Sequence, residues 1–354
     1  MYSAFDEAMM RRALALAEKG LFTATPNPRV GCVITQGESV VGEGWHERAG
    51  EPHAEARALT AAGPRAAGGT VYVNLEPCSH YGRTPPCAQA LIDAKVARVV
   101  AALRDPDPQA ACGGDALAAA GIRFEHGLLE AEARELNLGF LSRVQRGRPW
   151  VRLKVAATLD GRTALASGAS QWITGPEARR DGHRWRARAC ALLTGIGTVT
   201  ADDPRLTVRE VETARQPLRV IVDSRLEVPP EAQILRGAKV LIFAARAAPA
   251  PQNAEVVVAP NAHGKVDLPR MLAELARRGV NELHVEAGFR LNGSLVREGC
   301  VDEFLVYLNP SFLGDGAQGM VDLPAVGALA ERLKLKLVSL DRLGEDLRIL
   351  ARPA

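Results

Sequence analysis

The amino-acid sequence alternates between helix-like and strand-like hydrophobic patterns along nearly its whole length. Such alternation is typical of an α/β protein, in which helices cover a largely parallel sheet. In the first half, Gln36-Gly37-Glu38 can join the opening two strands as a hairpin. The pattern there predicts helices near 4–19, from 53, near 86–94, 114–120 and 130–145, and strands near 29–35, 39–45, 69–75, 97–103 and 122–124.

The segment RGRP at 146–149 is the clearest interruption of this pattern. A glycine and a proline follow a long helical stretch there and precede a new strand. Because 354 residues exceed the size at which single cores usually stop growing, we expect two domains, 1–145 and 150–354. In the second domain, the hydrophobic pattern predicts strands near 150–158, 190–195, 218–224, 238–244, 255–259, 282–287 and 302–308. It predicts helices near 176–188, 198, 268–278 and 290–298. The domain is expected to close with an antiparallel hairpin of 335–341 and 346–351.

Composition excludes several classes of protein. Hydrophobic residues make up 47% of the chain and charged residues 24%, as in globular rather than disordered proteins. The formal charge of +3 is too small to indicate a nucleic-acid or anionic-membrane surface. The first twenty residues form an amphipathic pattern rather than a signal peptide, and no apolar run is long enough to span a bilayer. We therefore expect a cytoplasmic protein with no nucleic-acid or membrane partner.

Two short motifs carry candidate metal ligands. His53 and Glu55 belong to the sequence HAE, and Cys78 and Cys87 delimit CSHYGRTPPC. One histidine and two thiolates would leave the fourth tetrahedral position of a zinc ion open, as a catalytic site requires. The other cysteines are interpreted as small core residues, since too few are present for a disulfide scaffold. These are Cys32, Cys112, Cys190 and Cys300.

The spacing of His53 and Glu55 sets a geometric condition. Two positions are about 200° apart on a regular helix, so both side chains reach one pocket only at a helix N-terminus. Pro52 favours such a start, and Cys87 opens a second apolar helix after two prolines. Zinc nucleobase deaminases combine H-x-E with P-C-x-x-C, the glutamate acting as acid and base without binding the metal. Here eight residues separate the cysteines, which predicts a loop over the pocket.

The motifs HAE and EPCSHYGRTPPC, with PNPRVGCVI upstream, resemble the deaminase half of the bifunctional riboflavin-biosynthesis deaminase/reductase family. The resemblance implies a cytidine-deaminase-like three-layer domain with one zinc ion held by His53, Cys78 and Cys87. It also implies that Glu55 shuttles protons. Contacts with the substrate are implied for Asn27, His46, His80 and Arg83. The remaining histidines are interpreted as structural, namely His126, His183, His263 and His284.

The second half lacks the G-x-G-x-x-G fingerprint of a Rossmann dinucleotide site. It instead contains KVAATLDGRTA, SQWIT, GIGTVTADDPRLTVR and EAGFRLNGSL, which place Gly, Thr or Asp after apolar strands. These motifs resemble the reductase half of the same family, which is similar in fold to dihydrofolate reductase, over most of 150–354. The resemblance implies NADPH contacts from Ala156, Trp172, Thr198, Asp202, Ser224, Gly288, Phe289, Arg290, Leu291, Asn292, Gly293 and Ser294. It implies substrate contacts from Lys154, Ser170, Arg186, Leu206, Arg209 and Glu286.

The resemblance implies two successive reactions. The first is hydrolytic deamination of 2,5-diamino-6-(ribosylamino)-4(3H)-pyrimidinone 5'-phosphate, and the second is NADPH-dependent reduction of the ribosyl side chain to ribityl. It also implies a homo-oligomer. Two alternatives remain: a tRNA or nucleoside deaminase with an appended domain, and a zinc-stabilised binding module with a reductase-like sensor. The cysteine spacing and the small net charge argue against the former, whereas the latter predicts a closed zinc site and no NADPH oxidation.

Overall fold

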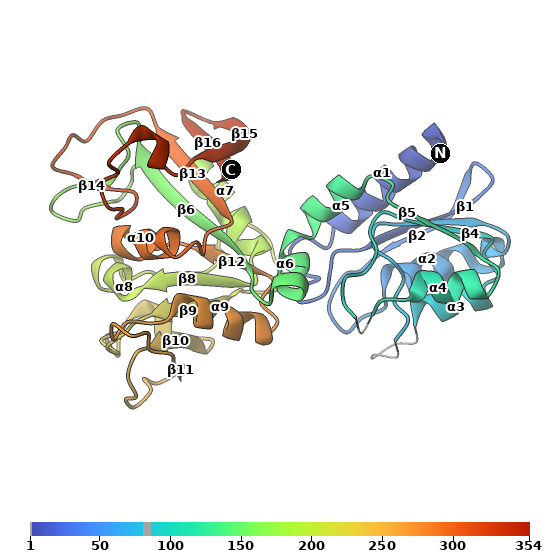
Figure 1. The fold of residues 1–354 in the computed structure, drawn as a ribbon, viewed down its shortest axis with the longest axis horizontal. Helices are drawn as coiled ribbons and strands as arrows, with labels where there is room; N and C mark the ends of the chain where they lie inside the picture. Colours follow the sequence, from blue (N-terminus) through green and yellow to red (C-terminus); the bar gives the residue numbers. More distant parts are fainter. Residues whose placement is uncertain (1, 81–85, 109) are drawn as a thin grey trace. The chain divides into compact units, whose positions relative to one another are not determined.

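The computed structural model of the chain describes residues 2–80, 86–108 and 110–354. They form two compact units, Met1–Gly147 (unit 1) and Arg148–Ala354 (unit 2), shown in Figure 1. Among the described residues, no helix combines the length and the apolar character needed to cross a bilayer.

Unit 1 is built on a five-stranded sheet in the order β2-β1-β3-β4-β5. Its strands are β1 (Gly31–Gln36), β2 (Ser39–Trp45), β3 (Thr70–Val73), β4 (Arg98–Ala101) and β5 (Arg123–His126). The helices are α1 (Ala4–Glu18), α2 (Ala54–Ala62), α3 (Cys87–Asp93), α4 (Gly113–Ala119), α5 (Glu130–Leu136) and α6 (Leu138–Arg146). In Figure 1, α1 and α5 lie on one face of the sheet, and α2, α3 and α4 lie on the other.

The strand directions in this sheet are mixed. The predicted hairpin is confirmed, with Gln36 opposite Ser39 and Gly37 at a φ of 57°. Because β1 is antiparallel to both β2 and β3, only the β3–β4 and β4–β5 pairs are parallel. The expectation of a largely parallel sheet is therefore wrong for unit 1. A tight turn makes β2 antiparallel to β1, and β3 pairs with the other edge of β1 while running in the same direction as β2.

Asn137 interrupts the helix that was predicted as one piece over 130–145. Its φ of −115° separates α5 from α6. The Asn137 side chain accepts a hydrogen bond from the backbone N–H of Arg29 at 2.8 Å and donates one to the carbonyl of Arg29 at 3.0 Å. The same two bonds support the segment before β1, which lines the cavity of unit 1.

The four cysteines interpreted as core residues differ in exposure. Cys32 and Cys300 are buried, and Cys190 is half-buried. Cys112 is exposed and caps α4 with a left-handed backbone, so its interpretation as a core residue is wrong.

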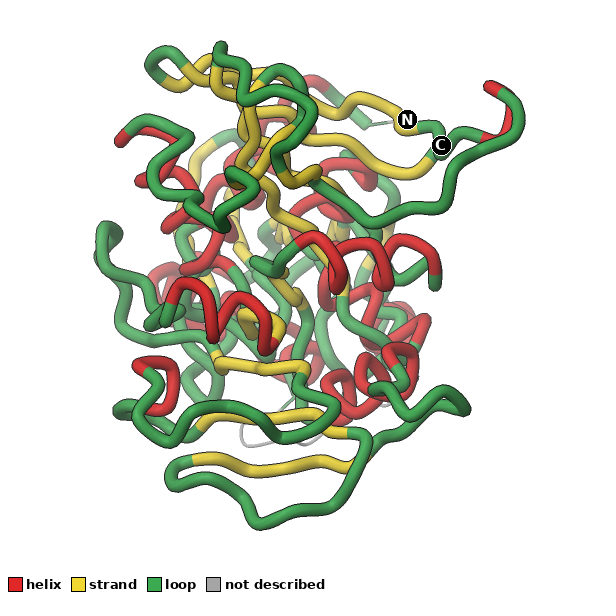
Figure 2. Tube along the Cα trace, turned by 90° about the vertical axis from the view of Figure 1, so that its left-hand side faces the viewer, coloured by secondary structure: helices red, strands yellow, loops and turns green. Residues whose placement is uncertain are grey.

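Unit 2 contains a nine-stranded sheet in the order β11-β10-β9-β8-β12-β6-β13-β16-β15. Figure 2 shows helices (red) on both sides of its strands (yellow). The strands are β6 (Trp150–Thr158), β8 (Ala191–Gly195), β9 (Leu218–Val222), β10 (Val240–Ala244), β11 (Ala254–Val258), β12 (Glu282–Val285), β13 (Glu303–Asn309), β15 (Leu335–Leu343) and β16 (Asp346–Pro353). The helices are α7 (Pro176–Arg188), α8 (Ile196–Asp202), α9 (Leu268–Arg277) and α10 (Phe289–Arg297).

Seven neighbouring strands of this sheet, from β11 to β13, are parallel. The predicted closing hairpin is confirmed: β15 and β16 are antiparallel, with Leu343 opposite Asp346, and β15 is the edge strand. A small antiparallel pair, β7 (Arg162–Ala164) and β14 (Gln318–Gly319), was not predicted because two or three residues are too few to show a period.

The two faces of the central strands differ in polarity. Leu153 of β6 and Leu283 of β12 pack with Met271 of α9 in an apolar core. The opposite face carries buried charged groups, including Arg152, which lies 4.3 Å from the centre of the Trp185 ring on α7. This buried polar face follows from the alternation of side chains along each strand.

Candidate active sites

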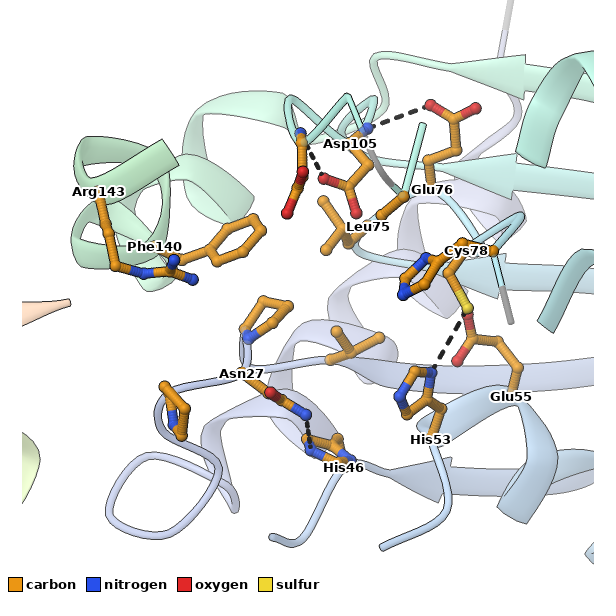
Figure 3. Close-up of a pocket in the computed structure, with 16 residues that line it drawn as sticks. Asn27, His46, His53, Glu55, Leu75, Glu76, Cys78, Asp105, Phe140 and Arg143 are labelled. Atoms are coloured by element: carbon orange, nitrogen blue, oxygen red, sulfur yellow. Dashed lines mark hydrogen bonds between the residues drawn. The ribbon is translucent and has the colours of Figure 1, made fainter. Parts of the chain in front are cut away.

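Three potential metal ligands come together in unit 1. The Nδ1 atom of His53 lies 3.7 Å from Sγ of Cys78 and 3.3 Å from Sγ of Cys87 (Figure 3). Ligand atoms of all three residues lie within 4.8 Å of one another. Within the described residues, no other group of three or more His, Cys, Asp or Glu side chains meets this condition.

These separations fit a zinc ion. Tetrahedral zinc, with bonds of about 2.3 Å to sulfur and 2.0–2.1 Å to nitrogen, requires nitrogen and sulfur ligands about 3.6 Å apart. The two observed distances of 3.7 and 3.3 Å lie on either side of this value. Two thiolates and one imidazole are also a donor set that zinc prefers.

Two helix N-termini place these ligands. The helix α2 begins at Ala54, with His53 as its N-cap residue at φ −69° and ψ 165°. It therefore starts two residues after Pro52. As N-cap and second helical residue, His53 and Glu55 both line one cavity, as the end-on arrangement requires. Cys87 is the first residue of α3, as predicted, and its backbone N–H lies 3.4 Å from Sγ of Cys78.

Gly44 allows α2 to approach the sheet closely at this point. A Cβ atom added to Gly44 of β2 would lie 2.6 Å from the carbonyl oxygen of Ala54, the first residue of α2. Because that neighbour is backbone, it has little freedom to yield. The lack of a side chain at Gly44 therefore helps to set the height of His53 and Glu55 above the sheet.

The electrostatics of the cluster follow from burial and mutual contact. Contact with Cys87 and His53 lowers the pKa of Cys78 to about 4, although burial opposes the shift. Glu55 is only 4% exposed, and burial together with the neighbouring Cys78 thiolate raises its pKa to about 7. Figure 3 shows the Glu55 carboxylate beside the Cys78 sulfur.

A cavity of about 220 Å³ opens onto His53, Cys78 and Glu55. His80 lines it and is exposed, whereas Arg83 lies outside the described residues. The cavity also has acidic and aromatic walls that sequence reasoning missed. These walls include Glu76, Asp105, Asp107 and Phe140.

Asn27 and His46 form one wall of this cavity and contact each other. His46 is only 2% exposed, and its Nε2 atom lies 3.0 Å from Nδ2 of Asn27. Its other ring nitrogen lies 3.3 Å from the carbonyl oxygen of Pro52. Both ring nitrogens of His46 therefore contact protein groups. Asn27 is the better placed of the two residues to contact a ligand in the cavity.

Unit 2 contains a larger cavity, with a volume of about 1520 Å³. It lies at the carboxyl ends of β8, β9 and β12, where ligands bind in open α/β sheets. The predicted substrate residues of this half line it, namely Lys154, Ser170, Arg186, Leu206, Arg209 and Glu286.

The predicted cofactor residues also line this cavity, except for Gly293. A Cβ atom at Gly293 would lie 2.2 Å from the backbone oxygen of Asp322, so this glycine serves packing. The segment Phe289–Ser294 forms the first turns of α10, which confirms the helix expected near 290–298, and Gly288 provides the extended N-cap conformation. Backbone N–H groups of that first turn are free to face an anionic ligand.

A charged cluster lines the same cavity as the predicted cofactor residues. Arg186 donates to both carboxylate oxygens of Glu286, with Nη2 at 2.8 Å from Oε2, and its Nη1 donates to the carbonyl of Thr207 at 3.0 Å. Nζ of Lys154 lies 3.9 Å from Oε2 of Glu286. Burial would raise the pKa of Glu286, but Arg186 and Lys154 hold it well below its usual value. Burial lowers the pKa of Lys154.

Comparison with known proteins assigns the chain to a family. Residues 149–349 match the family described as RibD C-terminal domain, and residues 3–103 match the cytidine and deoxycytidylate deaminase zinc-binding region. The riboflavin biosynthesis protein RibD of Escherichia coli (strain K12) is 47% identical over 96% of this chain and 97% of its own length. The chain belongs to the RibD family.

Solved RibD structures share the whole fold. The structure titled Acinetobacter baumannii RibD, form 1, superimposes with a TM-score of 0.93 at 42% identity, covering 99% of both chains. A Thermotoga maritima protein, titled a diaminohydroxyphosphoribosylaminopyrimidine deaminase/5-amino-6-(5-phosphoribosylamino)uracil reductase, superimposes with a TM-score of 0.91 at 31% identity and the same coverage. The predicted fold class, with a cytidine-deaminase-like and a reductase part, is confirmed.

Membership of the RibD family establishes the activity. The protein is a bifunctional enzyme of riboflavin biosynthesis that catalyses a zinc-dependent deamination and an NADPH-dependent reduction. Both the deaminase and the oxidoreductase predictions are confirmed.

Sequence reasoning missed two histidines that line the RibD reductase cavity. His183 and His263 were interpreted as structural, yet both contribute to the cavity wall. Neither lies in a motif with another ligand-like residue, so no local signal could have identified them.

Proposed function

We propose that the two reactions are divided between the units. Residues 1–145 form the deaminase domain, which acts on 2,5-diamino-6-(ribosylamino)-4(3H)-pyrimidinone 5'-phosphate. Residues 150–354 form the reductase domain, which converts the ribosyl side chain of the deaminated product to ribityl. The observation that carries this division is that each cavity is lined by described residues of one unit alone.

In the deaminase domain, we assign the zinc ligands to His53, Cys78 and Cys87. Zinc bound in this way supplies Lewis-acid activation of water. Glu55 is not a ligand in this assignment. Its carboxylate is buried in the cavity wall beside the ligands, where it can take a proton from the attacking water and deliver it to the departing ammonia.

Recognition of the pyrimidine is assigned to the cavity wall opposite Glu55. Asn27 offers an amide to the ring, and His46 orients that amide through the 3.0 Å contact. His80 and Arg83 are proposed to meet the phosphate-bearing end of the substrate. His46 acts in this scheme through Asn27 rather than as a direct contact, because its exposed fraction is 2%.

In the reductase domain, NADPH supplies a hydride when bound. We propose that α10 receives its phosphates through Gly288 and the first helical turn, and that Ser224 and Thr198 contact the rest of the cofactor. Lys154 and Glu286 face the sugar that is reduced. Lys154 is held beside Glu286, at 3.9 Å, where it can hydrogen-bond to a sugar oxygen.

The hydrogen bonds of Arg186 change the role expected for it. Its Nε, Nη1 and Nη2 atoms already donate to Glu286 and Thr207, so it is better placed to hold Glu286 than to bind the substrate phosphate. Arg209 is exposed in the same cavity, and within the described part of the chain its guanidinium donates one hydrogen bond, to Oγ1 of Thr207 at 3.1 Å. We assign the substrate phosphate to Arg209.

We further propose that the enzyme works in the cytoplasm as a homo-oligomer, with no nucleic-acid or membrane partner. All six cysteines are free of disulfides, as is typical of a reducing compartment. The edge strand β15 exposes Leu335, Leu337 and Leu340, which supports association of copies of the chain.

Two substitutions test the deaminase assignments. Glu55→Gln should retain zinc and lower deamination by at least about a hundredfold, because it removes the acid/base group. Cys78→Ala should lose both zinc and deamination, because one ligand is gone. Elemental analysis measures zinc, and ammonia release measures deamination.

Both variants should reduce a pre-deaminated substrate at the wild-type rate, which serves as the folding control. Unchanged deamination by Glu55→Gln would refute its role, and full zinc content in Cys78→Ala would refute the ligand set.

A further inference from the structure

A row of buried polar side chains extends from the reductase cavity into unit 2. Glu282, His284 and Glu286 alternate along and beyond β12, so they point to the same side of the sheet. The inner end of the row is neutralised, because Glu282 contacts Arg152 at 3.0 Å and Arg188 at 2.8 Å. The outer end, Glu286, lines the cavity.

His284 occupies the middle of this row and has 0% exposure. Among the described residues, neither of its ring nitrogens has a partner that meets ordinary hydrogen-bond geometry. Its Nε2 atom lies 3.5 Å from Oε1 of Glu286. Its in-register neighbours are Leu192 of β8 and Arg152 of β6, and neither offers a side-chain acceptor. The carboxylate of Glu286 is therefore the acceptor that Nε2 of His284 faces.

An imidazole at this position is costly unless it interacts with Glu286. A buried polar group without a partner typically destabilises a protein, whereas a leucine of similar volume would be favoured there. Burial also lowers the pKa of His284, which keeps the ring neutral with a single N–H. Placed on Nε2, that hydrogen points at Oε1 of Glu286 and makes a charge-assisted contact.

We propose that His284 is a positioning residue of the reductase site, whose Nε2–H holds Glu286 between Arg186 and Lys154. Glu286 then has three supports: Arg186 from α7, Lys154 from β6 and His284 from β12. Losing the third support lets the carboxylate rotate and alters the distance between Lys154 and the reacting sugar. This inference rests on the proposed role of Glu286 in reduction.

The experiment compares His284→Leu with His284→Gln, whose amide N–H can replace the ring N–H. Reduction of the pre-deaminated substrate is followed by loss of NADPH absorbance. For His284→Leu we expect kcat to fall about tenfold, the size of effect typical of one hydrogen bond to a charged group. We expect His284→Gln to recover to within about threefold of wild type. The Kd for NADPH and the rate of deamination should stay within about twofold in both variants.

Val285→Ala is the matched control. Val285 is the next residue of β12, is equally buried and points to the opposite, apolar face. It should lower Tm without changing kcat for reduction, since it does not touch Glu286. An equal loss of kcat in Val285→Ala would show that any core defect in β12 impairs reduction, and would overturn the proposal.

A double-mutant cycle with Glu286→Gln isolates the coupling. If His284 acts through Glu286, adding His284→Leu to Glu286→Gln should cause no further loss of kcat. A full additional loss would overturn the proposal, as would wild-type reduction by His284→Leu or failure of His284→Gln to recover. Wild-type reduction by Glu286→Gln alone would instead refute the proposed role of Glu286.

Discussion

At the scale of single residues, the chemistry of unit 1 depends on a difference between two neighbours. His53 ends the preceding loop as an N-cap, so its ring turns toward Cys78 and Cys87. Glu55 is already inside the helix, and its buried carboxylate lies beside the same cluster. A proton carrier must be near the metal without binding it, and the role proposed for Glu55 uses this two-residue offset at the start of α2.

Buried histidines also make the stability of unit 2 dependent on pH. Burial, together with Arg186 and Arg209, lowers the pKa of His183 to about 4. An unfolded chain takes up a proton on histidine below about pH 6.5, whereas the folded state resists it down to about pH 4. Stability is therefore complete above about pH 6.5 and falls with decreasing pH, by up to about 3 kcal/mol from this residue.

His183→Asn should reduce this pH dependence. An asparagine oxygen can still accept the backbone N–H of Arg209, which lies 3.3 Å from Nδ1 of His183, but it does not titrate. The free energy of unfolding in urea, measured at pH 7 and pH 4.5, should differ less between the two conditions for this variant than for wild type. His126→Asn, a change in unit 1 at an exposed histidine, is the control and should leave the dependence unchanged. The prediction would be contradicted if the free energy of unfolding changed by the same amount between pH 7 and pH 4.5 in all three proteins.

At the scale of elements, the position of α2 on the sheet controls the metal site. The contact between β2 and α2 is close because β2 carries Gly42 and Gly44 beneath the helix, each with α2 backbone less than 3 Å from a Cβ atom that would be added. Gly42 and Gly44 occupy alternate positions of β2 that face the same helix, and together they leave a groove in which α2 packs. The height of His53 therefore depends on residues far from any zinc motif.

Gly44→Ala should weaken zinc binding. The added methyl group would lie 2.6 Å from the carbonyl oxygen of Ala54 and would lift the first turn of α2 away from Cys78. We expect at least about a tenfold loss of zinc affinity, by analogy with defects in groups that support metal ligands. Gly69→Ala is the control: its Cβ would lie 2.6 Å from the backbone oxygen of Thr35, an equal clash away from α2. Competition with a chelator measures affinity, and equal losses in both variants would contradict the prediction.

At the scale of the whole molecule, the two sites are built independently. The cavity lining of unit 1 comes from described residues between Pro26 and Arg143, and that of unit 2 from residues between Lys154 and Asp322. Neither cavity borrows a described side chain from the other unit. A substitution that impairs one reaction should therefore leave the rate of the other reaction unchanged.

Mixing two inactivated proteins tests this independence. Glu55→Gln should strongly slow deamination and Glu286→Gln should slow reduction in the proposed scheme, so each protein alone should convert the diamino substrate to the ribityl product more slowly than wild type. An equimolar mixture should restore product formation, because the deaminated intermediate can pass from one protein to the other. Product is measured chromatographically. The control is each variant alone at the same total protein concentration. Absence of product from the mixture would show that the two steps require one intact chain.

Much of the fold follows from local patterns in the sequence. Hydrophobic period and turn residues predict most helices and strands, including both hairpins, because they reflect which side of an element is buried. They mislead where a single side chain decides, as at Asn137, whose two hydrogen bonds to Arg29 split a helix. Strand direction in unit 1 was also misjudged, because it depends on which strands become neighbours.

For the sites, the sequence by itself determined the types of candidate ligand, since HAE and the two cysteines offer the nitrogen and sulfur donors that zinc prefers. Only the tertiary structure decided which atoms meet: Nδ1 of His53 against the cysteine sulfurs, Asn27 against His46, and Arg186 on Glu286. It also brought His183 and His284 into the reductase unit's polar interior, where no motif predicted them. The physical reason is that metal preference belongs to the side chain, whereas distance, burial and pKa belong to residues brought together from different elements.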